Sequence, residues 1–238
     1  MNFQLLELDT TLFGFKVAKI LSSRLSLAEL QITLDELRNQ NVRLVFWPSD
    51  STDASSRQAA KKFNGILCSE QTTYLIDLKE LSPPSLTATG VEIFQEKAPT
   101  IELEQLALQA GTYSHFKNDP NFPPEFFLKL YRVWIANSVN GSVASRVIVI
   151  WHDNKVVAMA TLGTKNNRGD IGLLAVNEDF RGKKFGTKLV HAAQAYFIEI
   201  GFSHAQVVTQ KENTLACRLY EKCGFHQEKI ENYYHFWL

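Results

Sequence analysis

The stretch from Ile171 to Leu189, which reads IGLLAVNEDFRGKKFGTKL, restricts the possible folds of this chain more than any other. An apolar run ends in a basic loop that contains glycine, and a segment with Leu189, Ala192, Ala193 and Tyr196 at helical spacing follows directly. A strand, a turn and a helix in this order present unpaired backbone N–H groups and the positive end of a helix dipole to a phosphate. The sequence therefore predicts an α/β fold with a phosphate-bearing ligand at this loop.

Composition limits the class of protein. The 238 residues are 45% hydrophobic and 21% charged, which is typical of a globular chain with a substantial core. The formal charge of zero argues against binding nucleic acid through bulk electrostatics. No basic and apolar leader opens the chain and no apolar run reaches about 20 residues, so we expect a cytoplasmic protein without membrane contacts. The three cysteines lack CxxC or zinc-site spacing, which favours reduced thiols and no metal.

Two units and a linker are expected along the chain. Residues 1–78 resemble a small α/β domain, in which Ser26 and Glu29 form a capping box at the start of a helix. Residues 79–90 are rich in Ser, Thr and Pro and are predicted to be a linker before a second domain at 91–238. No internal repeat is visible. The elements expected in the first unit are a strand carrying Phe13, Phe15 and Val17, a helix to about Asn39, a strand 42–47 stopped by Pro48, a helix 53–63 and a strand 72–78.

The second unit shows a more regular alternation of elements. Its helices are predicted at 100–110, 125–138, 184–200 and 212–223, and its strands at 91–94, 143–151, 156–163, 171–176, 205–209 and 233–238. A loop dense in aromatic and polar residues, 111–124, separates the first two helices.

This order of elements, together with RGKKFG at 181–186, resembles the GCN5-related N-acetyltransferase (GNAT) superfamily. Its members carry [QR]-x-x-G-x-[GA] between a central strand and the helix that caps the pyrophosphate of acyl-CoA. Arg181 and Gly186 match, whereas Lys184 stands where a glycine is usual. The resemblance implies a GNAT fold, a central mixed and mostly antiparallel sheet flanked by helices, with a smaller α/β domain before it. A basic turn before a helix is also a common solvated cap, and this alternative stays open for the loop taken alone.

The string VTQKENTLACRLYEKCGF at 208–225 resembles the closing motif of the same superfamily, N-x-x-A-x-x-x-Y-x-x-x-G-F. Asn213, Ala216 and Tyr220 fall on one helical stripe, so one helix face can line a cofactor arm. The resemblance implies that Tyr220 is the catalytic acid that protonates the leaving thiolate of CoA; packing of Tyr220 in the core is the alternative. It also implies acetyl-CoA as co-substrate, with no metal. The residues expected to bind it are Leu174, Ala175, Val176, Arg181, Gly182, Lys183, Lys184, Phe185, Gly186, Thr187, Asn213, Ala216 and Tyr220.

Segments 111–116, 126–139, 171–176 and 208–225 further resemble the bacterial TDP-fucosamine acetyltransferase group, which acetylates the 4-amino group of a dTDP-4-amino-4,6-dideoxygalactose in surface polysaccharide synthesis. That group has Arg where this chain has His115. The residues expected to contact the acceptor are Tyr113, Ser114, His115, Phe116 and Asp119. His115 titrates in the range of a general base, and an equally acceptable interpretation is a structural or substrate-contacting histidine. The other five histidines show no partner pattern.

The amine must lose a proton to attack the acyl carbonyl, and the oxyanion needs donors, for which we expect backbone N–H groups of 173–176. The predicted function is transfer of an acetyl group to a nucleotide-linked amino sugar, a small-molecule substrate, by a possible homodimer. Two alternatives stay open. One is a GNAT enzyme for another amine, such as a protein N-terminus, a Lys side chain, a polyamine or an aminoglycoside. The other is a module that binds acyl-CoA or a sugar nucleotide without turnover.

Overall fold

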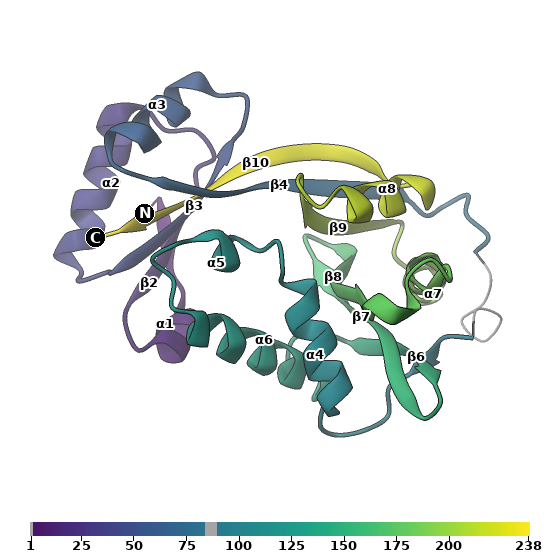
Figure 1. Ribbon diagram of the computed structural model, residues 1–238. Helices are drawn as coiled ribbons and strands as arrows, with labels where there is room; N and C mark the ends of the chain where they lie inside the picture. Colours follow the sequence, from purple (N-terminus) through teal and green to yellow (C-terminus); the bar gives the residue numbers. More distant parts are fainter. Residues whose placement is uncertain (1, 84–89) are drawn as a thin grey trace.

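A computed structural model describes residues 2–83 and 90–238, and these form one continuous ten-stranded sheet with helices on both faces (Figure 1). The first unit contains β1 (Phe3–Leu5), α1 (Glu7–Phe13), β2 (Val17–Ile20), α2 (Leu27–Asn39), β3 (Leu44–Asp50), α3 (Ala54–Lys62) and β4 (Ile66–Asp77). The rest contains β5 (Glu92–Ile93), α4 (Ile101–Ala110), α5 (His115–Asn118), α6 (Pro124–Val139), β6 (Arg146–His152), β7 (Lys155–Lys165), β8 (Arg168–Val176), the 3₁₀ turn η2 (Glu178–Phe180), α7 (Phe185–Glu199), β9 (His204–Gln210), α8 (Thr214–Lys222) and β10 (His226–Trp237).

The strand order is β1-β2-β3-β10-β4-β9-β8-β7-β6-β5, and only the neighbours β2·β3 and β8·β9 run parallel. This confirms a mixed, mostly antiparallel sheet. The last strand of the chain, β10, lies between β3 and β4 and pairs with both. The first 78 residues and the C-terminal part of the chain therefore share one sheet. The expected division into 1–78, a linker 79–90 and 91–238 stays a prediction, and part of that linker, 84–89, lies outside the described residues.

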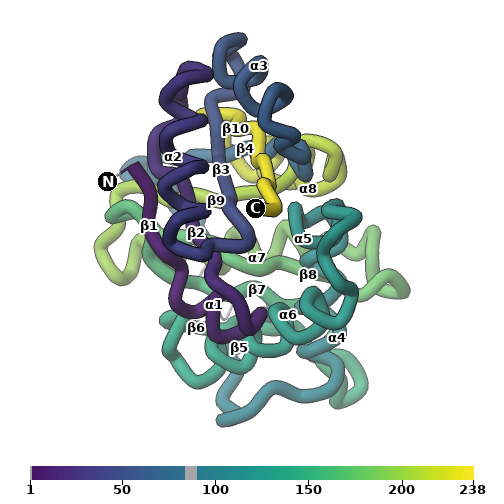
Figure 2. Tube along the Cα trace, turned by 90° about the vertical axis from the view of Figure 1, so that its left-hand side faces the viewer, coloured from purple at the N-terminus to yellow at the C-terminus, as the bar shows by residue number. Residues whose placement is uncertain are grey.

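Alternation along the strands separates the core into two faces. On one face α1, α4, α5 and α6 cover the sheet, and Phe46, Leu173 and Tyr233 pack in this layer. On the other face, α2 and α3 cover one half, where Trp47 is buried, and α7 and α8 cover the other half, where Val207 is buried. Both views place α1 beside α6 (Figures 1 and 2). None of the helices within the described ranges is long and apolar enough to cross a membrane.

The structure contains a repetition that the sequence does not show. The elements β3, α3 and β4 recur with the same lengths 160 positions later as β9, α8 and β10; β3 begins at Leu44 and β9 at His204. The helices α2 and α7 also align at this interval, and the buried Leu30 and Leu37 correspond to the buried Val190 and Phe197. The last strand of each repeat pairs with the first strand of the other: β4 pairs with β9, and β10 pairs with β3.

Two local predictions about the first unit are wrong. Phe13 ends helix α1 instead of lying on a strand, and Gly14 stops that helix with a left-handed φ of 76°. Pro48 does not stop β3. Its nitrogen lies on the side opposite β10, where β2 has already ended at Ile20, so the missing N–H breaks no ladder bond. The capping box of Ser26 and Glu29 is confirmed, with Oγ of Ser26 accepting from N of Glu29 at 3.3 Å.

Candidate active site

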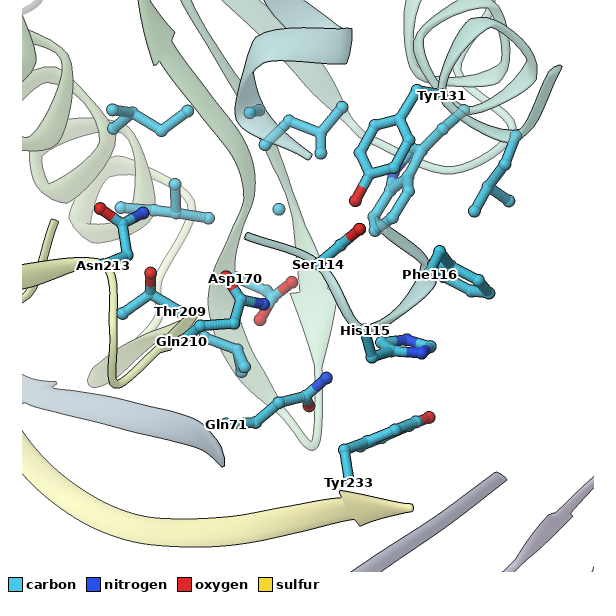
Figure 3. A pocket seen from close by; sticks show the side chains of 18 of the residues that line it. Gln71, Ser114, His115, Phe116, Tyr131, Asp170, Thr209, Gln210, Asn213 and Tyr233 are labelled. Atoms are coloured by element: carbon cyan, nitrogen blue, oxygen red, sulfur yellow. The ribbon is translucent and has the colours of Figure 1, made fainter. Parts of the chain in front are cut away.

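A cavity of about 490 Å³ lies where β8 and β9 separate, and residues from both halves of the chain line it. Its walls come from β8 and β9, from α8 on one side of the sheet and α5 and α6 on the other, and from side chains of the strands β2 and β10 (Figure 3). The cavity therefore passes through the sheet at the only place where two parallel neighbours diverge into open space within the described part of the chain.

The divergence has a local cause in β8. Pairing of β8 with β9 covers only Gly169–Ile171, and a bulge follows in which N of Leu173 donates to Oγ1 of Thr161 at 2.8 Å. Asn177 N donates to Val157 O on the β7 side at 2.9 Å. Because N–H directions alternate along a strand, those of Leu174 and Val176 point to the opposite side, away from β7. Two backbone donors thus face the gap that β9 leaves.

Helix α8 brings its predicted stripe to the same cavity. Asn213 caps the helix, its Oδ1 accepting from N of Ala216 at 3.3 Å, and Asn213, Ala216 and Tyr220 all line the wall. Tyr220 is 4% exposed, and burial raises the pKa of its hydroxyl, so the phenol stays protonated at neutral pH. Within the described residues its hydroxyl makes no hydrogen bond. The arrangement offers a proton donor inside the cavity.

The charged groups in the cavity carry both signs. Lys19 from β2 and Lys165 from β7 line it, and neither has an ion-pair partner within 4.0 Å among the described residues. Burial lowers the pKa of Lys19, and the repulsion from Lys165 adds to this effect. Asp9 and Asp170 also line the cavity, and burial raises the pKa of both carboxyl groups. Asp170 lies near the centre of the view in Figure 3 and accepts from Nε2 of Gln206 at 2.8 Å.

Comparison with known proteins now gives the family. Residues 110–225 match the family model described as the acetyltransferase (GNAT) family. They form a GNAT acetyltransferase domain. The family consists of acyl-CoA-dependent N-acetyltransferases that use acetyl-CoA as co-substrate, and the predicted GNAT resemblance is confirmed.

Solved structures show the same fold over more than the GNAT domain. A GCN5-related N-acetyltransferase from Sphaerobacter thermophilus superposes with a TM-score of 0.62 at 13% identity, over 99% of this chain and 76% of that chain. A tandem GNAT protein from the clavulanic acid biosynthesis pathway gives a TM-score of 0.58 at 14% identity, over 94% of this chain and 76% of that one. The structural similarity extends through the N-terminal unit, and at this low sequence identity it shows a shared fold only.

In sequence the chain is similar to the spore coat polysaccharide biosynthesis protein SpsD of Bacillus subtilis (strain 168). The two are 30% identical over 168 residues, which cover 67% of this chain and 56% of the relative. The chain therefore matches little more than half the length of that relative.

The loop predicted to bind phosphate, 181–187, lies outside the cavity wall and next to α8. Gly182 adopts a left-handed φ of 78°, and Lys184, at the N-cap of α7, has φ 61°. Lys184 therefore takes the backbone conformation that a glycine favours, although it carries a side chain. Gly186 packs against Leu219 so closely that a Cβ would approach Leu219 Cδ2 to 3.0 Å. This contact joins the start of α7 to the helix that carries Tyr220.

The predicted cofactor residues divide into two sets. In the cavity wall lie Leu174, Asn213, Ala216 and Tyr220; outside it, on the end of β8, the loop and the start of α7, lie Ala175, Val176, Arg181, Gly182, Lys183, Lys184, Phe185, Gly186 and Thr187. The amide of Leu173 is occupied by Thr161, so it drops out of the expected oxyanion donors.

The predicted acceptor residues divide in the same way. Ser114, His115 and Phe116 line the cavity on the side opposite Asn213 (Figure 3). Tyr113 is 41% exposed and lies outside the wall. Asp119 was expected at the acceptor, and the structure corrects this: its fully buried carboxylate accepts from Nδ1 of His235 at 2.6 Å and from Nε1 of Trp237 at 2.9 Å.

Sequence reasoning missed several residues of this site. Lys19, Gln71, Tyr131 and Tyr233 line the cavity from β2, β4, α6 and β10. His235, to which no role was assigned, lies between Asp119 and His115. Alternation along the last strand places Tyr233 and His235 on one face, but only the insertion of β10 into the sheet brings that face to His115.

Proposed function

We propose that this protein transfers an acetyl group from acetyl-CoA to the amino group of a nucleotide-linked amino sugar, with dTDP-4-amino-4,6-dideoxygalactose as the acceptor to test first. The observation that carries the proposal is the single cavity that connects the Tyr220 face of α8 with an acceptor side holding both lysines and carboxylates. The likeness to SpsD, a polysaccharide biosynthesis protein, supports an amino sugar as the acceptor.

The gap between β8 and β9 suits the arm of acetyl-CoA, which supplies the activated acetyl group. The N–H groups of Leu174 and Val176 point into this gap without a strand partner, and an amide-bearing chain offers the carbonyl oxygens that they need. The loop 181–187 and the N-terminus of α7 would hold the pyrophosphate through backbone N–H groups and the helix dipole. Lys184 places a cation at this point.

Tyr220 and the backbone divide the chemistry of the transfer. One of the two N–H groups beside the gap stabilises the negative charge that develops on the acetyl oxygen when the amine attacks, and the other holds a carbonyl of the acetyl-CoA arm. Tyr220, protonated and without a competing hydrogen bond in the described structure, donates its proton to the sulfur as the C–S bond breaks. The buried cysteines need no nucleophilic part, since the amine attacks directly.

The charges on the acceptor side suit a molecule that carries both an ammonium and phosphates. Asp170 and Asp9 would attract the amino group, and Lys19 and Lys165 would attract the phosphates. Phe46, Phe116 and Tyr233 present apolar surface for a base or a deoxysugar methyl group. A purely cationic acceptor, such as a polyamine, would leave the two lysines opposed by like charge.

A thiol-release assay with acetyl-CoA tests the proposal. Release of CoA should require a dTDP-amino sugar, and dTDP-4-amino-4,6-dideoxygalactose should give the highest kcat/KM of a panel that includes peptide amines, spermidine and an aminoglycoside. Turnover with peptide amines but with no sugar nucleotide would overturn the choice of acceptor. The absence of turnover with every amine, despite binding of acetyl-CoA, would favour the binding-module alternative.

A further inference from the structure

Three buried side chains form a hydrogen-bonded chain behind the acceptor wall. Nδ1 of His115 lies 2.7 Å from Nε2 of His235, and Nδ1 of His235 lies 2.6 Å from Oδ2 of Asp119. Two further donors hold Asp119, namely Nε1 of Trp237 at 2.9 Å and the backbone N of Asn121, which donates to Oδ1 at 2.9 Å. The residues come from α5, the loop after it and β10, so only the folded chain assembles them.

The chain of bonds sets which ring nitrogens carry protons. Burial raises the pKa of Asp119, but hydrogen bonds from His235, Asn121 and Trp237 outweigh it and hold this pKa below its usual value, so the group is a carboxylate that accepts. Nδ1 of His235 must therefore carry the proton that it donates to Asp119, which leaves Nε2 of neutral His235 as an acceptor. That atom accepts from Nδ1–H of His115. The unprotonated nitrogen of His115 is then Nε2.

Nε2 is also the ring nitrogen of His115 that is left free, because Nδ1 is held by His235. His115 lines the cavity, and within the described residues its Nε2 has no hydrogen-bond partner. In that part of the chain, the side-chain nitrogen and oxygen atoms that are both fully buried and without a partner are Ser49 Oγ, Ser69 Oγ and Thr72 Oγ1. Nε2 of His115 is not among them, so this unpartnered nitrogen is not fully buried. Its lone pair is accordingly available to a molecule in the cavity.

We infer that His115 is the general base of the transfer, and that His235 and Asp119 are positioning residues that keep its Nε2 unprotonated and take up the charge of the abstracted proton. This inference rests on the proposed function for its reaction, while the arrangement of protons is independent of the acceptor.

Two protons leave the acceptor nitrogen, one from the ammonium before the attack and one as the amide forms. The first moves to Nε2 of His115, Nδ1–H of His115 passes its proton to Nε2 of His235, and His235 becomes an imidazolium beside the Asp119 carboxylate. The freed amine forms a C–N bond with the acetyl carbon, the C–S bond breaks, and the sulfur receives its proton from Tyr220. The second nitrogen proton returns to Tyr220 through water in the cavity, and the histidines release the first proton to solvent, so one amide, one CoA thiol and one proton result.

The surroundings keep both rings neutral before the reaction. Burial, His235 and Lys19 lower the pKa of His115 well below its usual value, and burial lowers that of His235 against the opposing effect of Asp119. The other titratable groups nearby are Tyr233, whose ring centroid lies 4.1 Å from that of His115, and Cys68 beside Asp119. Burial raises the pKa of both, so they stay uncharged. His115 is therefore in its basic form across neutral pH, and kcat should fall only at acidic pH.

The substitution Asp119→Asn distinguishes a role of Asp119 in setting the histidine tautomers from a role in packing alone. An Asn amide can donate to Nδ1 of His235, which reverses both tautomers and places a proton on Nε2 of His115. We expect kcat to fall by about 10²–10⁴-fold, the range of general-base catalysis, with little change in either KM. Trp237→Phe is the matched control, because it removes the other side-chain donor to Asp119 and leaves the tautomers unchanged; its kcat should stay within about threefold of the wild type.

Nitrogen NMR of histidine-labelled protein reads the tautomers directly, in the absence of any substrate. The wild type should show Nε2 of His115 unprotonated and Nδ1 protonated, and Asp119→Asn should exchange the two. His115→Ala should lose activity to the same extent as Asp119→Asn and regain part of it with added imidazole. A protonated Nε2 in the wild type, or an Asp119→Asn enzyme with unchanged kcat, would overturn the inference. The NMR experiment tests the tautomers of the two histidines even if sugar nucleotides are not the acceptors.

Discussion

The two parallel strand pairs of the sheet, β8·β9 and β2·β3, begin alike and end differently. Each pair covers three residues, Gly169–Ile171 with 205–207 and Val17–Lys19 with 44–46. Beyond this point β8 continues for five residues to Val176 and opens the cavity, whereas β2 stops at Ile20. The same strand arrangement thus leaves an open cleft in one half and a closed one in the other.

The closed cleft is filled by its own side chains. Trp47 is fully buried there, and its Nε1 donates to O of Ser22 at 2.7 Å. Asp50 N donates to O of Ser23 at 2.8 Å and ties the loop after β2 to the end of β3. At the position that Tyr220 occupies in the second repeat, the first has Ala60. The first half therefore lacks the strand extension, the glycine-containing loop and the tyrosine, and instead contributes Lys19 and Gln71 to the cavity of the second.

The largest expected effect comes from removing Tyr220, the proposed acid, which has no counterpart in the closed half. Tyr220→Phe should lower kcat by about 10²–10⁴-fold while acetyl-CoA binds as before, because the phenol acts only as the C–S bond breaks. Steady-state kinetics and calorimetry measure the two quantities. Tyr74→Phe is the control: this neighbouring hydroxyl donates to Oε1 of Glu221 at 2.9 Å and has no part in the reaction. An equal loss of kcat in both variants would indicate that Tyr220 has a packing role and is not the acid.

A substitution in the closed half should lower the stability of the protein and leave ligand binding unchanged. Trp47→Ala leaves a cavity between β3 and the loop after β2, so we expect the free energy of unfolding to fall by about 3–5 kcal/mol. Urea denaturation measures this, and Trp47→Phe should lose less. The dissociation constant of acetyl-CoA should not change. A weaker affinity in a still folded Trp47 variant would show that the two halves are coupled.

Acid should destabilise the protein through the buried histidines beside the open cleft. The folded-state pKa values of His115 and His235 are lowered, so the unfolded chain binds more protons below its histidine pKa of about 6.5. Stability should fall as the pH drops below about 6.5, by up to about 1.4 kcal/mol per pH unit for each histidine. Denaturation series between pH 7 and pH 5 should show a shallower slope for His115→Asn, and an unchanged slope would contradict neutral burial.

The local parts of this contrast could be predicted and the long-range parts could not. The capping box at Ser26 and the strand, loop and helix around Arg181 depend on neighbouring residues, and both appear where the sequence predicts them. The insertion of β10 depends on pairing between segments more than 150 residues apart, which no local pattern encodes. For the same reason the contact of Asp119 with His235, 116 positions later, stayed hidden.

A smaller effect distinguishes the N-caps of the corresponding helices α7 and α2. Lys184 adopts φ 61°, whereas Ser26 adopts an extended φ of −68° and caps with its side chain. Lys184→Gly should raise the free energy of unfolding by about 0.5–1 kcal/mol, because glycine adopts this conformation without steric cost. Ser26→Ala should lower it by about 1 kcal/mol. Thermal or urea unfolding measures both, and a destabilised Lys184→Gly protein would contradict the assignment of strain.

Titration calorimetry with acetyl-CoA tests most directly whether only one of the two clefts is a ligand site. The wild type should bind one acetyl-CoA per chain. Ala216→Trp, which fills the open cleft as Trp47 fills the closed one, should bind none, and Trp47→Phe should still bind one. Two molecules bound per chain, or undiminished binding by Ala216→Trp, would contradict the account.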